Sequence, residues 1–184
     1  MPFLKSLPAD AGPPNVFAAY PEIYRPWSEM SQALMNGPSP LDQGQRELIL
    51  AYAAGLGGCS FVCVAHSEVA YAWGVEKGLI DKLLANPDSA PVDARFKLLL
   101  AYVRKLVQTP REMAPADADA VFEAGWNEQA LHDAIAVTAR AAFMQRLVEG
   151  YGFVALSRET AAKHAMRRVE HGYVNLYPAF RERK

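Results

Sequence analysis

The sequence predicts an all-α protein, and three observations indicate this class. Apolar residues recur at helical spacing through most of the chain after residue 41, proline and glycine residues separate these stretches, and no segment alternates between apolar and polar residues as a strand would. With 184 residues, 51% of them hydrophobic, the chain is long enough for one domain with its own core. We therefore expect a single-domain helical bundle built around an antiparallel helical hairpin.

Residues 1–40 are expected to form an irregular arm of this domain. They hold eight of the thirteen prolines, and proline removes an amide donor and disfavours helix at the residue before it. The arm therefore has room for at most one or two short helices, for example over 27–36. Its aromatic residues indicate that it packs on the core of its own chain or on a neighbouring subunit; they are Phe3, Phe17, Tyr20, Tyr24 and Trp27.

The helical domain is expected to span residues 41–184. Asp42 and Gln45 have the spacing of an N-terminal capping box, and the glycine-rich segment 55–58 is typical of a helix end. The second helix of the hairpin follows, from about residue 59 to 73. Further helices are expected at 76–85, 91–108, 115–124, 128–149 and 157–169.

Charge and hydropathy exclude several classes of partner. The 19 basic and 20 acidic residues give a net charge of −1, so we expect neither a nucleic acid nor an anionic membrane surface as partner. No apolar run approaches the ~18 residues that span a bilayer, and the first residues lack the apolar segment of a signal peptide. The expected location is the cytoplasm, where two cysteines are normally reduced thiols.

The reactive side chains gather on the expected hairpin. Cys59, Cys63 and His66 lie on one helix and face the same way, within an arc of about 60°. If the glycine-rich turn folds the two helices back on each other, Glu47 lies at the level of His66. A carboxylate orients an imidazole, and an imidazole beside a thiol favours the thiolate. These four residues are therefore candidates for a proton relay to an attacking sulfur, with the other cysteine resolving a sulfenic acid.

Two other interpretations of the cysteines stay open. Free cysteine is among the most buried residue types, so Cys59 and Cys63 could be core residues. Together with His66 and Glu47 they could also bind a metal, although their spacing differs from the two-residue spacing typical of zinc sites. We expect no metal and no cofactor.

The remaining polar residues are interpreted as structural. His132 and Asp133 are adjacent and point about 100° apart on a helix, which is typical of a surface or packing pair. Arg168 belongs to a basic C-terminal stretch that is expected to be a solvated face. Tyr173 is expected to pack, and Arg140 and Arg146 are candidates for ion pairs between subunits.

The hairpin motif resembles the alkylhydroperoxidase D-like, carboxymuconolactone decarboxylase superfamily, and it is most similar to the uncharacterised peroxidase-related branch. The family pattern is a glutamate followed, twelve residues on, by Cys-x-x-Cys, with a histidine seven residues after the first cysteine. Glu47, Cys59 and His66 match this pattern in type and spacing. The similarity covers most of residues 39–155.

The sequence departs from the family pattern at the second cysteine. That position holds Val62, and Cys63 follows one residue later. In the family the second cysteine attacks the peroxide, the first resolves it into a disulfide, and the histidine and glutamate pass protons. These roles transfer directly to Glu47, Cys59 and His66, and to Cys63 by assumption only. The outcomes left open are an altered peroxidase, a single-thiol enzyme and a relative that has lost peroxidase activity.

The resemblance implies a thiol-dependent, antioxidant peroxidase that reduces a hydroperoxide and is regenerated by an external dithiol. It also implies a homo-oligomer (a dimer, trimer or hexamer). The alternatives are a lyase like the decarboxylases of the superfamily and a catalytically inactive helical oligomer. Because the decarboxylase branch lacks the cysteine pair, the two cysteines near His66 favour the peroxidase.

Overall fold

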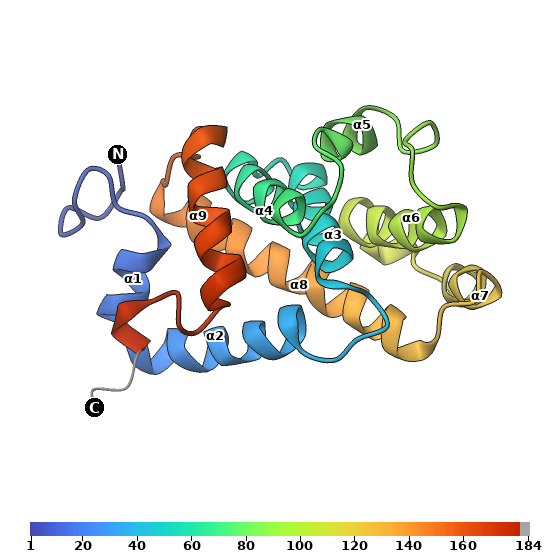
Figure 1. Cartoon of the computed structure of the whole chain (residues 1–184), viewed down its shortest axis with the longest axis horizontal. Helices are drawn as coiled ribbons and strands as arrows, with labels where there is room; N and C mark the ends of the chain where they lie inside the picture. Colours follow the sequence, from blue (N-terminus) through green and yellow to red (C-terminus); the bar gives the residue numbers. More distant parts are fainter. Residues whose placement is uncertain (181–184) are drawn as a thin grey trace.

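The computed structural model describes residues 1–180, which form nine α-helices and two 3₁₀-helices and contain no strand (Figure 1). The all-α class predicted from the sequence is confirmed. The helices are α1 (Pro13–Ala19), α2 (Pro21–Asn36), α3 (Gln43–Leu56), α4 (Ser60–Ala72), α5 (Leu79–Ala85), α6 (Ala94–Gln108), η1 (Pro110–Glu112), α7 (Pro115–Glu123), α8 (Glu128–Tyr151), α9 (Arg158–His171) and η2 (Pro178–Phe180).

The helices expected after residue 41 are all present, with shifted ends. The starts of two helices are shifted by three residues: α6 was expected from residue 91 and begins at Ala94, and α5 was expected from residue 76 and begins at Leu79. Gly78 precedes it with φ at 83°, in the left-handed region that glycine adopts at little cost. The turn at Gly78 therefore delays the helix by three residues.

The N-terminal arm is more helical than expected. The helix placed at 27–36 begins at Pro21, so α2 has 16 residues. Proline suits the first position of a helix because the amide there needs no intrahelical partner. Pro26 removes one hydrogen bond inside α2, but the helix compensates by burying one face, which includes Tyr24 and Met35.

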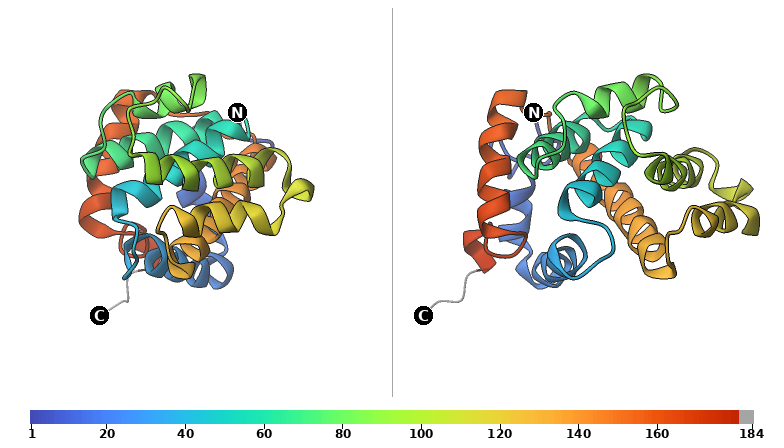
Figure 2. Two further views of the ribbon diagram at one scale, coloured as in Figure 1. Left: turned by 90° about the vertical axis from the view of Figure 1, so that its right-hand side faces the viewer. Right: turned by 45° about the vertical axis from the view of Figure 1, so that its right-hand side comes forward.

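The arm packs on the core of its own chain. Phe17 of α1 is fully buried, and its ring stacks on Tyr24 with 4.5 Å between the ring centroids. The same ring meets Tyr177 of the C-terminal segment edge to face, at 4.9 Å. The first and last segments of the described chain therefore meet at one end of the molecule, whereas α6 and α7 lie at the other (Figures 1 and 2).

α3 and α4 form the expected antiparallel hairpin, and it lies between α8 and α9 (Figures 1 and 2). The capping box is present: Asp42 Oδ1 accepts from the Gln45 amide at 2.7 Å, and Gln45 Oε1 accepts from the Asp42 amide at 3.0 Å. Gly58 makes the turn with φ at 77°, a value that favours glycine. The cap and the turn together set the register of the two helices.

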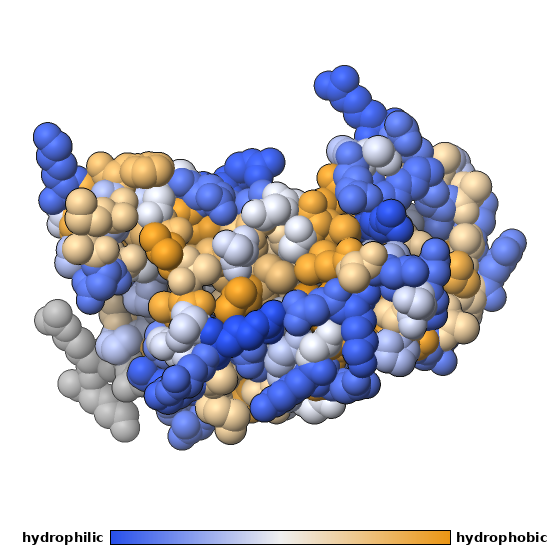
Figure 3. All heavy atoms as spheres, turned by 90° about the horizontal axis from the view of Figure 1, so that it is seen from above, coloured by the Kyte–Doolittle hydropathy of each residue, from blue (hydrophilic) through white to orange (hydrophobic). Residues whose placement is uncertain are grey.

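The surface mixes apolar and hydrophilic areas. On the face shown in Figure 3, hydrophobic patches alternate with hydrophilic side chains. Within residues 1–180, no helix combines the length and the hydrophobicity needed to cross a membrane.

We predict that Asp42→Ala lowers the free energy of unfolding by about 1 kcal/mol, because the α3 amide at Gln45 loses its cap. Denaturant unfolding followed by circular dichroism measures the change. Asp119→Ala, on the exposed side of α7, is the matched control and is expected to change it by less than about 0.5 kcal/mol. Equal effects of the two substitutions would contradict the role of the cap.

Candidate active site

Glu47 and His66 form a buried pair at the middle of the α3–α4 hairpin. Glu47 Oε2 lies 2.6 Å from His66 Nδ1, and the two residues are 1% and 5% exposed. The contact that the sequence predicted from the register of the hairpin is therefore present. Arg46, the neighbour of Glu47, fixes α3 by donating to the carbonyls of Leu34 and Gly37 at 2.7 and 2.9 Å.

Tyr173, which follows α9, holds the other side of the carboxylate. Its hydroxyl donates to Glu47 Oε1 at 2.5 Å. Its backbone amide donates to Gln32 Oε1 of α2 at 2.6 Å, which fixes the segment after α9. Both carboxylate oxygens of Glu47 therefore have partners. Tyr173 is buried and packs as expected, and its hydroxyl has a further role that the sequence did not predict.

The protonation of the pair follows from burial and from these hydrogen bonds. Burial lowers the pKa of His66 to about 4, an effect that Glu47 only partly offsets. Burial raises the pKa of Glu47, but attraction to His66 and the hydrogen bonds from His66 and Tyr173 reverse this and lower it. At neutral pH the carboxylate is ionised and the imidazole is neutral with its proton on Nδ1. Nε2 is then a free base.

A cavity of about 430 Å³ lies beside His66, between α4, α8 and α9. Val62 and His66 of α4 form part of its wall, and residues of the N-terminal arm close one side. Most of the remaining wall is apolar and includes Phe61, Val69, Met144, Val154, Leu156 and Leu176. A cavity with apolar walls and a few polar groups is the usual form of a small-molecule site.

Three arginines line this cavity: Arg140, Arg168 and the exposed Arg167. The expectations for Arg140 and Arg168 were wrong. Arg140 of α8 is 4% exposed and therefore cannot form the expected ion pair between subunits. Arg168 of α9 is half-buried and lines the cavity, so it does not belong to a solvated face. The guanidinium carbons of Arg140 and Arg168 lie 4.6 and 4.5 Å from the centre of the Tyr173 ring.

A pattern in the sequence could have identified Arg140 and Arg168 as buried site residues, but no pattern could have identified Tyr173. Arg140 follows Val137 by three residues and Arg168 follows Ala165 by three, so each arginine continues a buried stripe of its helix. An arginine on such a stripe is unusual and marks a candidate buried site. Tyr173 lies after the end of α9, where no periodic pattern applies.

The two cysteines are not part of the cavity wall formed by the described residues. Cys59 is the N-cap of α4 and is fully buried. Cys63 faces the packing between α3 and α5: a Cβ placed on Gly55 would lie 3.2 Å from its sulfur and 2.7 Å from a Leu84 methyl. The hairpin therefore joins Glu47 to His66, while Val62 occupies the cavity side of α4.

Both thiols are poor nucleophiles in these surroundings. Burial raises the pKa of Cys59 to about 11, and the nearby Glu149 adds to the effect. Burial also raises the pKa of Cys63, an effect that the hydrogen bond with Ser67 only partly offsets. The reactive form of cysteine is the thiolate, and burial disfavours this form for both side chains.

A metal has no evident place among these residues. Within residues 1–180, no three His, Cys, Asp or Glu side chains are grouped so as to hold an ion. Glu47 uses both oxygens for His66 and Tyr173.

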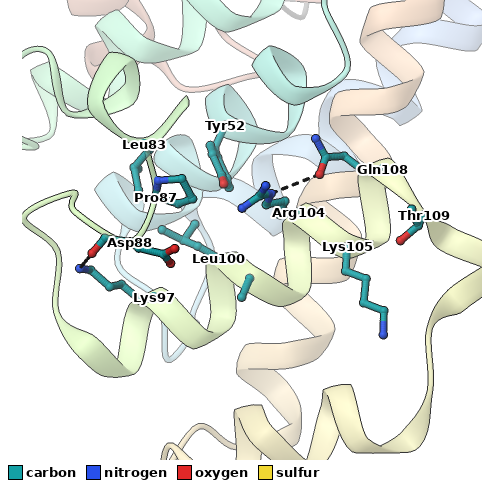
Figure 4. Close-up of a pocket in the computed structure, with 11 residues that line it drawn as sticks. Tyr52, Leu83, Pro87, Asp88, Lys97, Leu100, Arg104, Lys105, Gln108 and Thr109 are labelled. Atoms are coloured by element: carbon teal, nitrogen blue, oxygen red, sulfur yellow. Dashed lines mark hydrogen bonds between the residues drawn. The ribbon is translucent and has the colours of Figure 1, made fainter. Parts of the chain in front are cut away.

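A second cavity, of about 310 Å³, lies between α3, α5 and α6 (Figure 4). Tyr52 and Leu100 form part of its wall. Two of its charged residues are held by hydrogen bonds: Arg104 Nε donates to Gln108 Oε1 at 3.2 Å, and Lys97 Nζ donates to the Asp88 carbonyl at 2.5 Å. No residue of the Glu47–His66 pair lines it, so the cavity beside His66 is the better candidate for a reaction site.

Two solved structures resemble the chain over most of its length. One is described as an uncharacterized peroxidase-related protein from Silicibacter sp. TM1040; it has a TM-score of 0.71 and 25% identity, and the match covers 78% of this chain and 76% of that one. The other is described as an alkylhydroperoxidase AhpD core, an uncharacterized peroxidase-related protein from Ralstonia eutropha JMP134, with a TM-score of 0.71, 23% identity and coverage of 77% and 75%. No protein-family model and no curated protein matches the chain.

We predict that the neutral His66 makes the fold sensitive to acid. The unfolded imidazole takes up a proton near pH 6.5, whereas the folded one does so only near pH 4. The contribution of His66 to the free energy of unfolding is therefore complete above pH 6.5 and is lost as the pH falls towards 4, by up to about 3 kcal/mol.

Urea unfolding at several pH values tests this expectation. His66→Asn is expected to flatten the pH dependence between 6.5 and 4 relative to the unchanged chain, and His132→Asn, at an exposed position, is the control. Identical pH dependence of the unchanged chain and His66→Asn would contradict a neutral buried imidazole.

We predict that Tyr173→Phe lowers the free energy of unfolding by about 1–3 kcal/mol, because it leaves one oxygen of a buried carboxylate without a donor. Tyr20→Phe, at a position that is 44% exposed, is the matched control and is expected to have little effect. Thermal and denaturant unfolding measure both. A Tyr173→Phe protein as stable as the control would show that the hydroxyl does not support Glu47.

Proposed function

We propose that the chain is an acid–base enzyme in which His66 removes a proton from the substrate. The chain has the fold of the alkylhydroperoxidase D-like superfamily, as its sequence resemblance predicted. The observation that carries this proposal is the buried Glu47–His66 hydrogen bond beside the cavity. With Nδ1 engaged by Glu47, Nε2 is the nitrogen left to act. A neutral imidazole held in one tautomer is a general base suited to neutral pH.

The proposed step is a simple proton transfer. Nε2 of His66 takes a proton from a carbon or oxygen of the substrate, and the electron pair of the broken bond stays on the substrate. The imidazolium that forms is stabilised by the Glu47 carboxylate. Arg140 and Arg168 line the same cavity, and preorganised positive groups of this kind stabilise negative charge on a bound substrate.

The positions of the cysteines support acid–base rather than thiol chemistry. The sequence favoured a peroxidase over a lyase because two cysteines lie near His66. Val62 occupies the position of the family's attacking cysteine and lines the cavity, whereas Cys63 packs between α3 and α5. The lyase alternative therefore gains support, because proton abstraction needs the histidine and the glutamate but no thiol.

A thiol-dependent peroxidase is the second candidate. Two observations favour it: the similar solved structures are described as peroxidase-related, and Cys59 lies at the N-terminus of α4, where helix amides favour a thiolate. In this scheme the Cys59 thiolate attacks the outer oxygen of a hydroperoxide and the O–O bond breaks, which gives a sulfenic acid and an alkoxide. The alkoxide takes up the proton that the thiol lost and leaves as an alcohol. Cys63 condenses with the sulfenic acid, releasing water, and an external dithiol reduces the disulfide.

Two assays on the same protein separate these candidates. Treated with one equivalent of a hydroperoxide, the folded chain is expected to retain both free thiols and an unchanged mass. Incubated in D₂O with levulinate, a ketone with exchangeable protons beside its carbonyl group, it is expected to catalyse deuterium uptake. His66→Asn and Glu47→Gln are expected to slow this uptake by at least about a hundredfold.

The matched control is the Cys59→Ser/Cys63→Ser protein, which is expected to exchange deuterium as fast as the unchanged chain. Loss of two thiols with a 2 Da decrease in mass would establish the peroxidase instead. Exchange that is equally fast in His66→Asn, or no exchange above the buffer rate, would overturn the acid–base proposal.

A further inference from the structure

The cavity beside His66 contains more positive charge than the described residues neutralise. Arg140 donates from Nε to Ser31 Oγ at 3.1 Å and lies 4.9 Å from the centre of the Trp27 ring. Its Nη1 is buried and has no hydrogen-bond partner, and the same is true of Nη1 of Arg168. Both residues line the cavity. Arg168 is also hydrogen-bonded to Tyr177. The two guanidinium groups come from different helices to the wall of one cavity, and each keeps one buried donor for which the described residues hold no acceptor.

The nearby carboxylate cannot supply the missing acceptors. Glu47 attracts both arginines, but its oxygens already accept from His66 and Tyr173. Asp10 and Arg167 also line the cavity, but both are exposed and their charges offset each other. Among the groups away from solvent, one ionised carboxylate faces two guanidinium groups, which leaves an excess of one positive charge. A buried charge without a hydrogen-bonded partner is costly, so a site of this kind is completed by an anion.

The rest of the wall indicates what the anion is attached to. Phe61 and Val62 of α4 and Met144 of α8 face the same space as the guanidinium groups. Inorganic anions are strongly hydrated and gain little from such a wall, whereas an apolar body gains about 25 cal/mol for each Å² that it buries. The volume of about 430 Å³ is within the range for sites that enclose small organic molecules.

We propose that this cavity binds a small organic acid, whose carboxylate pairs with Arg140 and Arg168 and whose apolar body lies against Phe61, Val62 and Met144. Planar guanidinium groups match the geometry of a carboxylate and bind it through paired, charge-assisted hydrogen bonds. An organic acid is thus the proposed substrate class of the acid–base site. Only the reaction that follows binding rests on the proposed function; the binding itself does not.

Binding of the acid also changes His66. The charged and titratable groups around its imidazole are Glu47 from α3, Arg140 from α8, Arg168 from α9 and Tyr173 after α9; the two arginines lower the pKa of His66. A carboxylate that neutralises the arginines removes this effect, so ligand binding raises the pKa of His66 towards neutral pH and makes Nε2 a stronger base.

Titration calorimetry on the full chain tests the binding site. Phenylacetate is expected to bind saturably with a Kd below about 1 mM. Phenylacetamide, which has the same shape without the charge, is expected to bind at least about tenfold more weakly. Inorganic phosphate is the third probe; binding by phosphate that equals binding by phenylacetate would show an anion site without selection for an organic acid and would overturn the proposal.

Variants of the two arginines locate the site. Arg140→Met and Arg168→Met are each expected to weaken phenylacetate binding at least about tenfold, and Arg146→Met, at an exposed position of α8, is the matched control with unchanged binding. Arg168→Met keeps the test valid if Arg140→Met does not fold, as judged by circular dichroism. Unchanged binding in the folded arginine variants, or no binding to the unchanged chain, would overturn the site.

His66→Asn separates the binding site from the proposed reaction. It is expected to lose deuterium exchange and to retain phenylacetate binding within about threefold, because both guanidinium groups remain. Binding without exchange in the unchanged chain would leave the acid site standing and reject the acid–base function. Deuterium exchange without phenylacetate binding would leave the acid–base function standing and reject the acid-binding site.

Discussion

The buried hydrogen bond between Glu47 and His66 is the interaction on which the site depends. It joins the two helices of the central hairpin at 2.6 Å, and it uses one imidazole nitrogen while leaving the other free. A buried carboxylate is stable only when its oxygens are satisfied, so the bond requires a second donor, which Tyr173 supplies from the far end of the chain. The C-terminal segment is thereby tied to the hairpin.

The charged residues around Tyr173 lower stability, and this cost is explained if they serve a function. Arg140 and Arg168 stack on the Tyr173 ring and keep buried donors without partners. An apolar core of the same size would avoid this cost, and large polar clusters in a protein interior are more often found where a ligand completes them. The cavity beside His66 is therefore better understood as a prepared binding site than as a packing defect.

The sequence predicted contacts within the hairpin but did not predict contacts between segments that are distant along the chain. Helix geometry and the glycine turn were sufficient to place Glu47 beside His66. The same geometry put Cys63 within about 40° of Cys59, but it could not show which neighbour each side of α4 meets. In the structure the Val62 side faces the cavity, and the Cys63 side faces α3 and α5. Tyr173 was missed because 126 residues separate it from Glu47.

The cavity side of α4 thus carries Val62 and His66, and Cys63 lies on the side that packs against α3 and α5. The acid–base function proposed for the hairpin depends on a neutral His66 with a free Nε2, which the ¹⁵N chemical shifts of the His66 ring at pH 6 measure directly. It predicts one neutral tautomer with the proton on Nδ1 and an unprotonated Nε2. An imidazolium at that pH, or a proton on Nε2, would contradict it.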